Sequence, residues 1–284
     1  MTVSPSQVKE LRAATGAGMM DCKRALQEAD GDMEAARDFL RKKGISIARK
    51  KSSRETNEGG IGIVAAGDGK TAGMVQLACE TDFVARNDQF GALLHHLAAQ
   101  TLTGGPENLK EQALEAGPGT VNDLIVEAIG KMGENLQLVN ASRIAVDGEG
   151  TLGEYVHTNM KIGVLVALGS AKAIPASDLE SLANDLAMHI AASQVSAIHG
   201  DDIDPAVIAK EKEIYAGQAK ESGKPENIIE KIVQGRLDKF VNEVSLMNQP
   251  FVKDPDNTVG QLLAGMGKEL GAELTVQRFE KFQF

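Results

Sequence analysis

An acidic side chain and an aromatic ring stand next to each other at Asp82 and Phe83, directly after an apolar segment that ends at Cys79. The apolar residues before them are typical of a strand, and a helical pattern begins at Asp88, so the pair lies in the connection between two elements. Connections of this kind often carry binding residues. The sequence therefore predicts that residues 79–83 are the functional segment of the protein.

The same segment offers one arrangement for catalysis, with Cys79 as a nucleophile and Asp82 and His95 or His96 as its helpers. Against this, Cys79 ends an apolar strand, where a buried and unreactive thiol is the commoner outcome. Two cysteines cannot form a disulfide framework, and the separation of Cys22 from Cys79 matches no compact metal-binding spacing. We therefore predict two reduced thiols, no catalytic residue, no cofactor and no metal site.

Composition is that of an ordinary globular protein. The chain has 284 residues, of which 42% are hydrophobic and 25% charged, and this length allows about two domains. No stretch approaches about eighteen apolar residues, and residues 1–5 lack the features of a signal peptide, so we expect a cytoplasmic protein without a membrane span. The formal net charge of −10 argues against nucleic-acid binding through the overall field.

Residues 41–54 carry seven basic side chains and no acidic one. One interpretation is a solvated linker, which short charged runs commonly form, and the other is a basic surface for an acidic partner. RNA binding would depend on the same run, but no aromatic side chain lies within it. We favour the linker, place it at residues 44–58, and expect no direct nucleic-acid contact.

The first 43 residues are expected to form a three-helix module. Ser4, Pro5 and Gln7 provide the hydroxyl cap, the first-turn proline and the returning amide of a helix start. Glycines follow this helix, a second helix begins at Met19, and residues 30–32 end it and cap a third. A module of this size is marginally stable alone.

Residues 59–147 are predicted to form a first α+β lobe. Two short strands, joined by an Asp-Gly turn at residues 67–70, are followed by a helix whose apolar stripe includes Phe90 and Leu97. A further helix is expected near residues 121–131, and a strand after it closes the lobe.

A second lobe with the same order of strand, strand and helix is predicted in residues 148–200 and 246–284. The segment from His189 resembles the segment from His96 at the matching point of the first lobe, which suggests a duplication. Both histidines lie beside apolar stripes, and we expect them to be structural. Residues 254–257 are expected to form a turn, and the lobe ends with a strand.

Residues 201–245 are predicted to form an antiparallel helical hairpin. One helix runs from Pro205, a turn at residues 222–225 reverses the chain, and the return helix has apolar residues at near coiled-coil spacing. Those residues are Ile229, Val233, Leu237, Phe240 and Val244. Such a hairpin exposes an apolar edge, so we expect a partner there, with a second copy of the chain as one candidate. A scaffold that acts through the hairpin alone would leave Asp82 and Phe83 unexplained.

Several short motifs follow one another along the chain in a specific order. Those of the N-terminus and first lobe are Val8-Lys9-Glu10-Leu11-Arg12, Thr15-Gly16-Ala17-Gly18-Met19-Met20-Asp21-Cys22-Lys23, Thr81-Asp82-Phe83-Val84 and Met132-Gly133-Glu134-Asn135. Those that follow are Gly153-Glu154-Tyr155-Val156-His157, Ser222-Gly223-Lys224-Pro225, Glu243-Val244-Ser245-Leu246, Gln249-Pro250-Phe251 and Thr258-Val259-Gly260-Gln261-Leu262-Leu263. In content and order these motifs closely resemble the bacterial elongation factor Ts family, over nearly the whole chain.

What the resemblance implies is a guanine-nucleotide exchange factor. Such a factor binds elongation factor Tu in its GDP-bound and nucleotide-free forms and speeds the release of GDP, so that GTP can bind. No covalent step is needed, and the factor is not an enzyme in the bond-making sense. The family has an N-terminal module similar to ubiquitin-associated domains, a core of two related lobes and a protruding helical hairpin used in dimer contacts. Periodicity and turn signals predict the same α+β partition.

The resemblance also implies roles for single residues. Phe83 would enter the partner's nucleotide-binding domain as a wedge, with Asp82 as its polar neighbour and Thr81 and Val84 at its flanks. The wedge would disturb the partner's magnesium site, which is sensitive because Mg²⁺ requires near-ideal octahedral oxygen ligands. Without that ion, the phosphates of GDP lose their main counter-charge.

Further partner contacts are implied for the N-terminal module and the core. They are Arg12, Met19, Met20, Lys23, Met132, Gly133 and His157. Met19 and Met20 have a second interpretation, in which one of them belongs to the module core, since adjacent helical residues rarely both face inward. His157 could be an ordinary surface histidine. Some family members continue into a C-terminal helical module that touches the partner, a contact not expected from a sequence that ends at Phe284.

Overall fold

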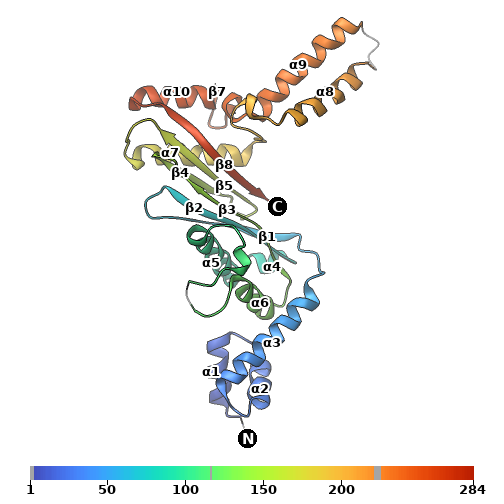
Figure 1. Ribbon diagram of the computed structural model, residues 1–284, viewed down its shortest axis with the longest axis vertical. Helices are drawn as coiled ribbons and strands as arrows, with labels where there is room; N and C mark the ends of the chain where they lie inside the picture. The colour runs from blue at the N-terminus through green and yellow to red at the C-terminus, as the bar shows by residue number, and fades with distance from the viewer. Residues whose placement is uncertain (1–2, 116, 221–224) are drawn as a thin grey trace.

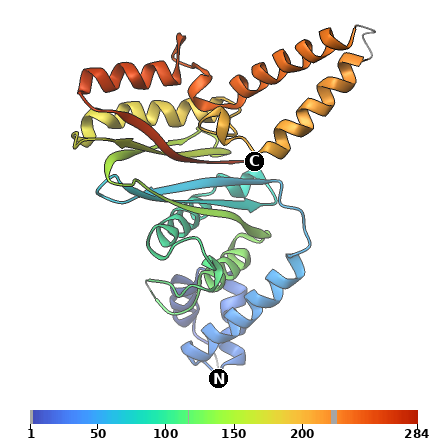
Figure 2. The same ribbon diagram turned by 45° about the horizontal axis from the view of Figure 1, so that its top comes forward.

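The chain combines helices with antiparallel sheets, as in an α+β fold. The computed structural model describes residues 3–115, 117–220 and 225–284. Along the molecule lie a group of N-terminal helices, two stacked three-stranded sheets with helices on their outer faces, and a projecting pair of helices (Figure 1, Figure 2). The predicted α+β class is confirmed. Among the described residues, no helix has both the length and the apolar character needed to cross a membrane.

Three helices form the N-terminal module, namely α1 (Pro5–Thr15), α2 (Met19–Glu28) and α3 (Met33–Lys51). The predicted start of α1 is confirmed, because the Ser4 hydroxyl accepts a hydrogen bond from the Gln7 backbone N–H and the Gln7 side chain accepts one from the Ser4 backbone N–H. The module buries a small core of its own, which consists of Val8, Leu11, Cys22, Ala25, Leu26 and Ala36.

The third helix continues well beyond the predicted end of the module, to Lys51. The prediction of a basic linker over residues 44–58 is wrong for most of that range, because Ile47 and Ala48 give this part of the helix an apolar side that packs on the first lobe. Only residues 52–57 connect the helix to the first strand. The basic run is therefore mostly a docked helix.

The first lobe contains an antiparallel sheet of three strands in the order β1-β2-β3. The strands are β1 (Glu58–Ala65), β2 (Thr71–Cys79) and β3 (Leu136–Ala145), and the helices are α4 (Asp82–Ala85), α5 (Asp88–Gly104) and α6 (Val121–Met132). Helices α5 and α6 lie on one side of the sheet (Figure 1), and their core includes Leu77, Phe90 and Leu97. The strands and helices predicted for this segment are confirmed, and α4 was not predicted.

The second lobe has the corresponding antiparallel strand order, β4-β5-β8. Its strands are β4 (Glu149–Val156), β5 (Ile162–Ser170) and β8 (Leu274–Gln283), and its helices are α7 (Ala176–Ala192) and α10 (Val259–Leu270). The structural role predicted for His189 is confirmed, because it is buried with Nε2 at 2.9 Å from Gln249 Oε1 and Nδ1 accepting from the Val252 backbone N–H at 3.2 Å. The two sheets share a core between them that includes Ile61, Met74, Leu165 and Phe282.

A small two-stranded sheet replaces the turn predicted at residues 254–257. Strand β6 (Pro250–Phe251) pairs with β7 (Asp254–Thr258), so the chain reverses at residues 252–253 instead. The composition of the predicted turn is typical of one, but pairing with a neighbouring strand outweighs that local preference. Phe251 is buried in the core of the second lobe and anchors this small sheet there.

The two helices predicted for residues 201–245 are α8 (Pro205–Lys220) and α9 (Glu226–Val244), and they project from the second lobe as a hairpin (Figure 1). Except for Pro225, the predicted turn at residues 222–225 lies outside the described part of the chain. The apolar seam of α9 is buried at Val233 and Leu237, in a cluster shared with α8. The contact with a partner stays a prediction.

Short 3₁₀ turns lie at Leu109–Glu111, Gly200–Asp202 and Leu246–Asn248.

Replacement of Gly153 with alanine tests how closely β4 and α7 pack. A Cβ atom at this position would lie 2.0 Å from the Ala183 carbonyl oxygen, which belongs to the backbone and cannot move aside without a shift of the helix. We expect Gly153→Ala to lower the free energy of unfolding, measured by urea denaturation, by roughly 2 kcal/mol. Gly217→Ala in α8 is the matched control, because a Cβ atom there meets nothing within 4 Å and alanine favours a helix. Equal stability of Gly153→Ala and the wild type would contradict the close packing.

Candidate functional site

The segment after β2 forms a short helix that carries the predicted acid and ring. Thr81 caps this helix, α4, because its hydroxyl accepts a hydrogen bond of 3.5 Å from the Val84 backbone N–H. Val84 and Ala85 pack against the core of the first lobe, whereas Phe83 is 83% exposed. The chain therefore presents a large apolar ring to solvent directly after a buried strand.

Asp82 lies beside the ring and forms an ion pair of 3.1 Å with Arg86, four residues later. The two side chains are 46% and 79% exposed, so the pair contributes little to stability. The acid and the ring are presented to solvent together, and Arg86 adds a cation that was not predicted.

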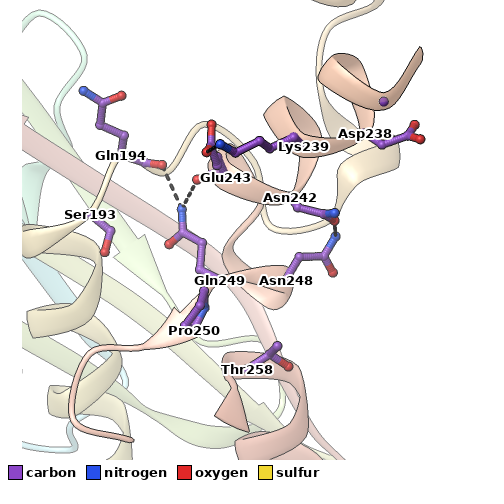
Figure 3. A pocket seen from close by; sticks show the side chains of 11 residues that line it. Ser193, Gln194, Asp238, Lys239, Asn242, Glu243, Asn248, Gln249, Pro250 and Thr258 are labelled. Atoms are coloured by element: carbon purple, nitrogen blue, oxygen red, sulfur yellow. Dashed lines mark hydrogen bonds and ion pairs between the residues drawn. The ribbon is translucent and has the colours of Figure 1, made fainter. Parts of the chain in front are cut away.

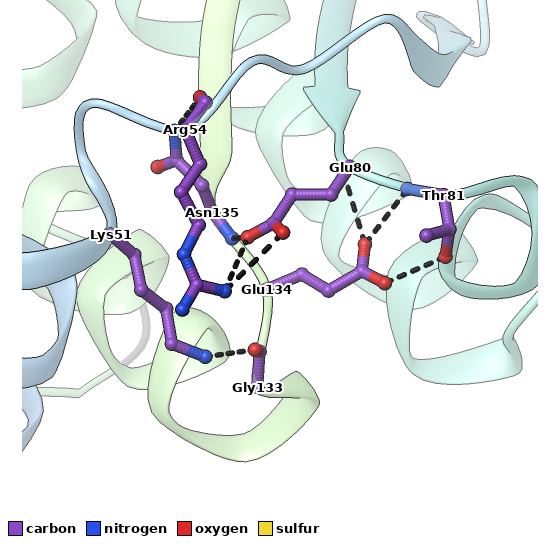
Figure 4. A network of polar contacts seen from close by, with 7 residues as sticks. All are labelled: Lys51, Arg54, Glu80, Thr81, Gly133, Glu134 and Asn135. Atoms are coloured by element: carbon purple, nitrogen blue, oxygen red, sulfur yellow. Dashed lines mark hydrogen bonds and ion pairs between the residues drawn. The ribbon is translucent and has the colours of Figure 1, made fainter.

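Glu134, which lies in the segment after α6, holds the residues that precede α4 (Figure 4). One carboxylate oxygen accepts hydrogen bonds from the backbone N–H groups of Glu80 and Thr81, at 3.1 and 3.0 Å, and the other accepts one from the Thr81 hydroxyl at 2.6 Å. Hydrogen bonds to a charged acceptor are about twice as strong as neutral ones. The turn that carries Phe83 is therefore fastened to the segment after α6.

Glu80 in turn binds the segment that follows α6. Its carboxylate accepts a hydrogen bond of 2.6 Å from the Asn135 backbone N–H and lies 3.3 Å from the Arg54 guanidinium. These contacts hold the pKa of Glu80 below its usual value, with the Asn135 hydrogen bond as the larger cause. Lys51 donates to the Gly133 carbonyl oxygen and Asn135 donates to the Arg54 carbonyl oxygen, so the end of α3 joins the same network (Figure 4).

The residues that hold the turn were not predicted. We use the term carboxylate clamp for Glu80 and Glu134 together with the backbone groups that they bind. The sequence contains a signal for the clamp, because Glu80 directly precedes the motif that begins at Thr81 and Glu134 lies within the motif that begins at Met132. It does not reveal the strand register, which pairs Cys79 with Leu136 and so brings the two acids together.

The burial predicted for Cys79 is confirmed. Its thiol donates a hydrogen bond of 3.2 Å to the Thr81 carbonyl oxygen. Burial, with the nearby charge of Glu134, raises the pKa of Cys79 to about 12, so the nucleophilic thiolate is scarce at neutral pH. Cys22 is buried and free as well. Within the ranges that the structure describes, no group of three or more His, Cys, Asp or Glu side chains could hold a metal ion.

Met132 and Gly133 lie next to the clamp. Helix α6 ends at Met132, and Gly133 follows with a φ of +78°, a left-handed conformation that favours glycine and ends the helix. Met132 is partly buried against the core of the first lobe, whereas Gly133 is exposed. Because Glu134 follows directly and binds Thr81, these two predicted contact residues border the Phe83 turn.

His157 lies in the turn between β4 and β5, on the second lobe. It is half-buried, and its Nδ1 atom lies 2.9 Å from the Tyr155 hydroxyl. The same turn reaches the first lobe, where Lys161 forms an ion pair of 2.6 Å with Glu58, the residue that pairs across the sheet with Cys79. The structure therefore places His157 at the end of the sheets that also carries the predicted acid and ring.

The predicted contact residues of the N-terminal module all lie at its surface, namely Arg12, Met19, Met20 and Lys23. Met19 and Met20 are 50% and 69% exposed, so neither belongs to the module core. The loop before Met19 touches the end of α6, because a Cβ atom at Gly16 would meet the Lys131 side chain at 2.7 Å. The module surface and the Phe83 turn are thus connected through α6.

A pocket of about 1050 Å³ lies elsewhere, between the hairpin and the second lobe (Figure 3). Its polar side chains bind each other and the backbone: Gln249 donates to the carbonyl oxygens of Gln194 and Glu243, and Asn248 donates to the Asn242 side chain. None of the predicted contact residues lines this pocket. The candidate site is the exposed surface around the Phe83 turn.

The clamp predicts a pH dependence of stability. Because contacts in the folded state lower the pKa of Glu80, its ionised form stabilises the fold above the ordinary value of 4.5, and this contribution is lost as the pH falls through the lower folded-state value. We expect Glu80→Gln to lower the free energy of unfolding by about 1 kcal/mol at neutral pH. Denaturation curves at several pH values should show this difference shrinking below pH 4.5.

Glu149→Gln is the matched control for this measurement. Its carboxylate forms a surface ion pair of 3.5 Å with Lys70 and is 51% exposed, so its replacement should have little effect at any pH. A difference between Glu80→Gln and the wild type that stays constant with pH would contradict the role given to the ionised carboxylate.

Comparison with known proteins identifies the family. Residues 80–284 match the family model described as Elongation factor TS. The elongation factor Ts of Nitratidesulfovibrio vulgaris (strain DP4) is 46% identical over 285 residues, which cover 100% of this chain and 96% of that protein. Those of Trichlorobacter lovleyi and Alkalilimnicola ehrlichii are 42% and 45% identical, over 99% and 100% of this chain and 92% of each relative. The chain therefore belongs to the elongation factor Ts family.

Proposed function

We propose that this protein is a guanine-nucleotide exchange factor that binds elongation factor Tu in its GDP-bound form and promotes the release of GDP, so that GTP can bind. Membership of the elongation factor Ts family supports this role in translation elongation. The factor lowers the affinity of its partner for GDP and makes or breaks no covalent bond.

The observation that carries the proposal is the exposed ring of Phe83. The ring is 83% exposed. Burial of an aromatic side chain of this size in an apolar gap of a partner makes the free energy of binding more favourable. In the proposed complex Phe83 enters the nucleotide-binding domain of the partner, with Asp82 as its polar neighbour and Thr81 and Val84 at its flanks. The side chains that it displaces lie near the bound nucleotide.

Displacement of these side chains disturbs the partner's magnesium site. Mg²⁺ requires near-ideal octahedral geometry with ligands at about 2.0–2.1 Å, so a small shift weakens its binding. The phosphates of GDP then lose their counter-charge and the nucleotide leaves. By thermodynamic reciprocity, GDP lowers the affinity of the partner for this protein by the same factor. The complex of all three components is therefore short-lived.

Further contacts extend the proposed interface. Met132 and Gly133 border the Phe83 turn, and His157 lies at the same end of the sheets, so these residues meet the partner together with the ring. The exposed residues of the N-terminal module form a second contact surface, which consists of Arg12, Met19, Met20 and Lys23. We propose that this module is related to ubiquitin-associated domains and that the hairpin serves dimer contacts.

We also propose that the two lobes are related by duplication. Each sheet begins with a strand whose second residue is a glycine with positive φ, Gly59 at +153° and Gly150 at +142°. A Cβ atom at either position would lie within 2.3 Å of a carbonyl oxygen of the next strand, that of Leu77 or Leu168. The same unusual requirement at the same place in both sheets supports a common origin.

Phe83→Ala tests the proposed function. Because the ring is exposed and makes little contact with the core, we expect the variant to fold and to keep the stability of the wild type. It should lose most of the stimulation of GDP release, measured as the fall in signal when fluorescent GDP leaves elongation factor Tu.

Val252→Ala is the control for Phe83→Ala, because it also truncates an exposed apolar side chain, 46% exposed, on a different part of the chain. It should stimulate release like the wild type. If Phe83→Ala stimulates release as strongly as Val252→Ala does, the wedge is not the ring and the proposal is wrong.

Cys79→Ser separates exchange from catalysis by the thiol. A serine hydroxyl can donate to the Thr81 carbonyl oxygen as the thiol does, so we expect a folded variant with the exchange rate of the wild type. Complete loss of activity in a variant with an unchanged circular dichroism spectrum would favour the enzyme alternative.

A further inference from the structure

The ring of Phe83 has little support of its own. Helix α4 has four residues, far fewer than an isolated helix needs to be stable in water. The ring is largely exposed, so packing does little to orient it. Its direction therefore depends on how the backbone is held, after the ring by Val84 and Ala85 against the core and before it at Thr81, where the Glu134 carboxylate binds.

We infer that Glu80 and Glu134 are positioning residues that hold the Phe83 turn in the orientation in which the ring enters the partner. The inference rests on the proposed exchange function and adds the device that prepares the ring before contact. A ring on a fixed turn loses less conformational freedom on binding than a ring on a mobile loop. The clamp thus favours formation of the complex in which the ring promotes the release of GDP.

The need for a carboxylate follows from where β2 ends. Cys79 is the last residue of β2 that pairs with both neighbouring strands, opposite Glu58 and Leu136. The next two backbone N–H groups have no strand to bind, and such groups need an acceptor when they are withdrawn from water. Glu134 accepts both of them and the Thr81 hydroxyl as well. One side chain therefore fixes the two residues that precede Asp82.

The clamp also connects the turn to the N-terminal module. The Arg54 guanidinium binds the Glu80 carboxylate and Lys51, the last residue of α3, binds the Gly133 carbonyl oxygen. Helix α3 begins in the module and ends at the clamp. The exposed surface of the module and the ring are therefore attached to one support, which keeps their spacing fixed.

A double-mutant cycle tests the inference. The rate of GDP release from elongation factor Tu, measured against the concentration of the exchange factor, gives a maximal rate and a half-saturating concentration. We expect Glu134→Ala to lower the maximal rate on the order of tenfold, as for the loss of charge-assisted hydrogen bonds. Combined with Phe83→Ala, the same substitution should have almost no further effect, because the turn then has no ring to position.

Two other variants separate positioning from stability. Glu134→Gln keeps an oxygen for the two N–H groups and offers an amide to the Thr81 hydroxyl, so it should retain much more of the maximal rate than Glu134→Ala. Glu149→Ala, which removes a surface ion pair with Lys70 at the opposite end of the β1–β2 hairpin, should behave like the wild type. Hydrogen exchange at the Thr81 amide should be faster in Glu134→Ala than in these two variants.

The outcomes distinguish the inference from the proposed function. The inference is overturned if Glu134→Ala releases GDP at the wild-type rate, or if its effect and that of Phe83→Ala simply add, while Phe83→Ala alone still loses stimulation. It is also overturned if Glu134→Gln is as impaired as Glu134→Ala although its Thr81 amide is protected. Undiminished stimulation by Phe83→Ala would instead overturn the proposed function.

Discussion

The antiparallel register between β2 and β3 pairs Cys79 with Leu136, and this pairing determines where the chain leaves the sheet on each side. An irregularity between Gln76 and Leu77 shifts the register, and a shift of one residue decides which side chains face the core. With the observed register Leu136 is buried and Gln137 is exposed. The segment that carries the ring then lies beside the end of α6, where Glu134 binds the backbone of Glu80 and Thr81 and Glu80 binds the backbone of Asn135.

Local signals predict most of the fold because they act over a few residues. The cap at Ser4, the Asp-Gly turn of the first hairpin and the apolar stripes of the helices each place an element correctly. The two errors come from packing and strand pairing that the local signals do not reveal. Ile47 and Ala48 keep α3 helical because they pack on the first lobe, and the turn-like residues after Lys253 pair with β6.

The candidate site likewise has a part that local sequence signals predict and a part that they do not. The burial of Cys79 follows from its place at the end of an apolar strand, so the sequence pattern predicts it, whereas the exposure of the Phe83 ring agrees with the role that the family resemblance implies. The clamp depends on two acids that are far apart in the chain, and only the strand register brings them together. Both acids are visible in the sequence, but their hydrogen-bond partners are not, because almost every residue carries a backbone N–H group and the sequence does not say which one an acid binds.

The strand order of the second sheet has a consequence for how the protein is made. Residues 162–170 of β5 pair with residues 274–283 of β8, whereas all strands of the first sheet have been synthesised by residue 145. At a synthesis rate of about 5–20 residues per second, β5 has an open edge for roughly 5–20 seconds while the hairpin and α10 are made. The first lobe and its Phe83 turn can therefore fold while the second sheet is still incomplete, and they offer it the apolar face on which to assemble.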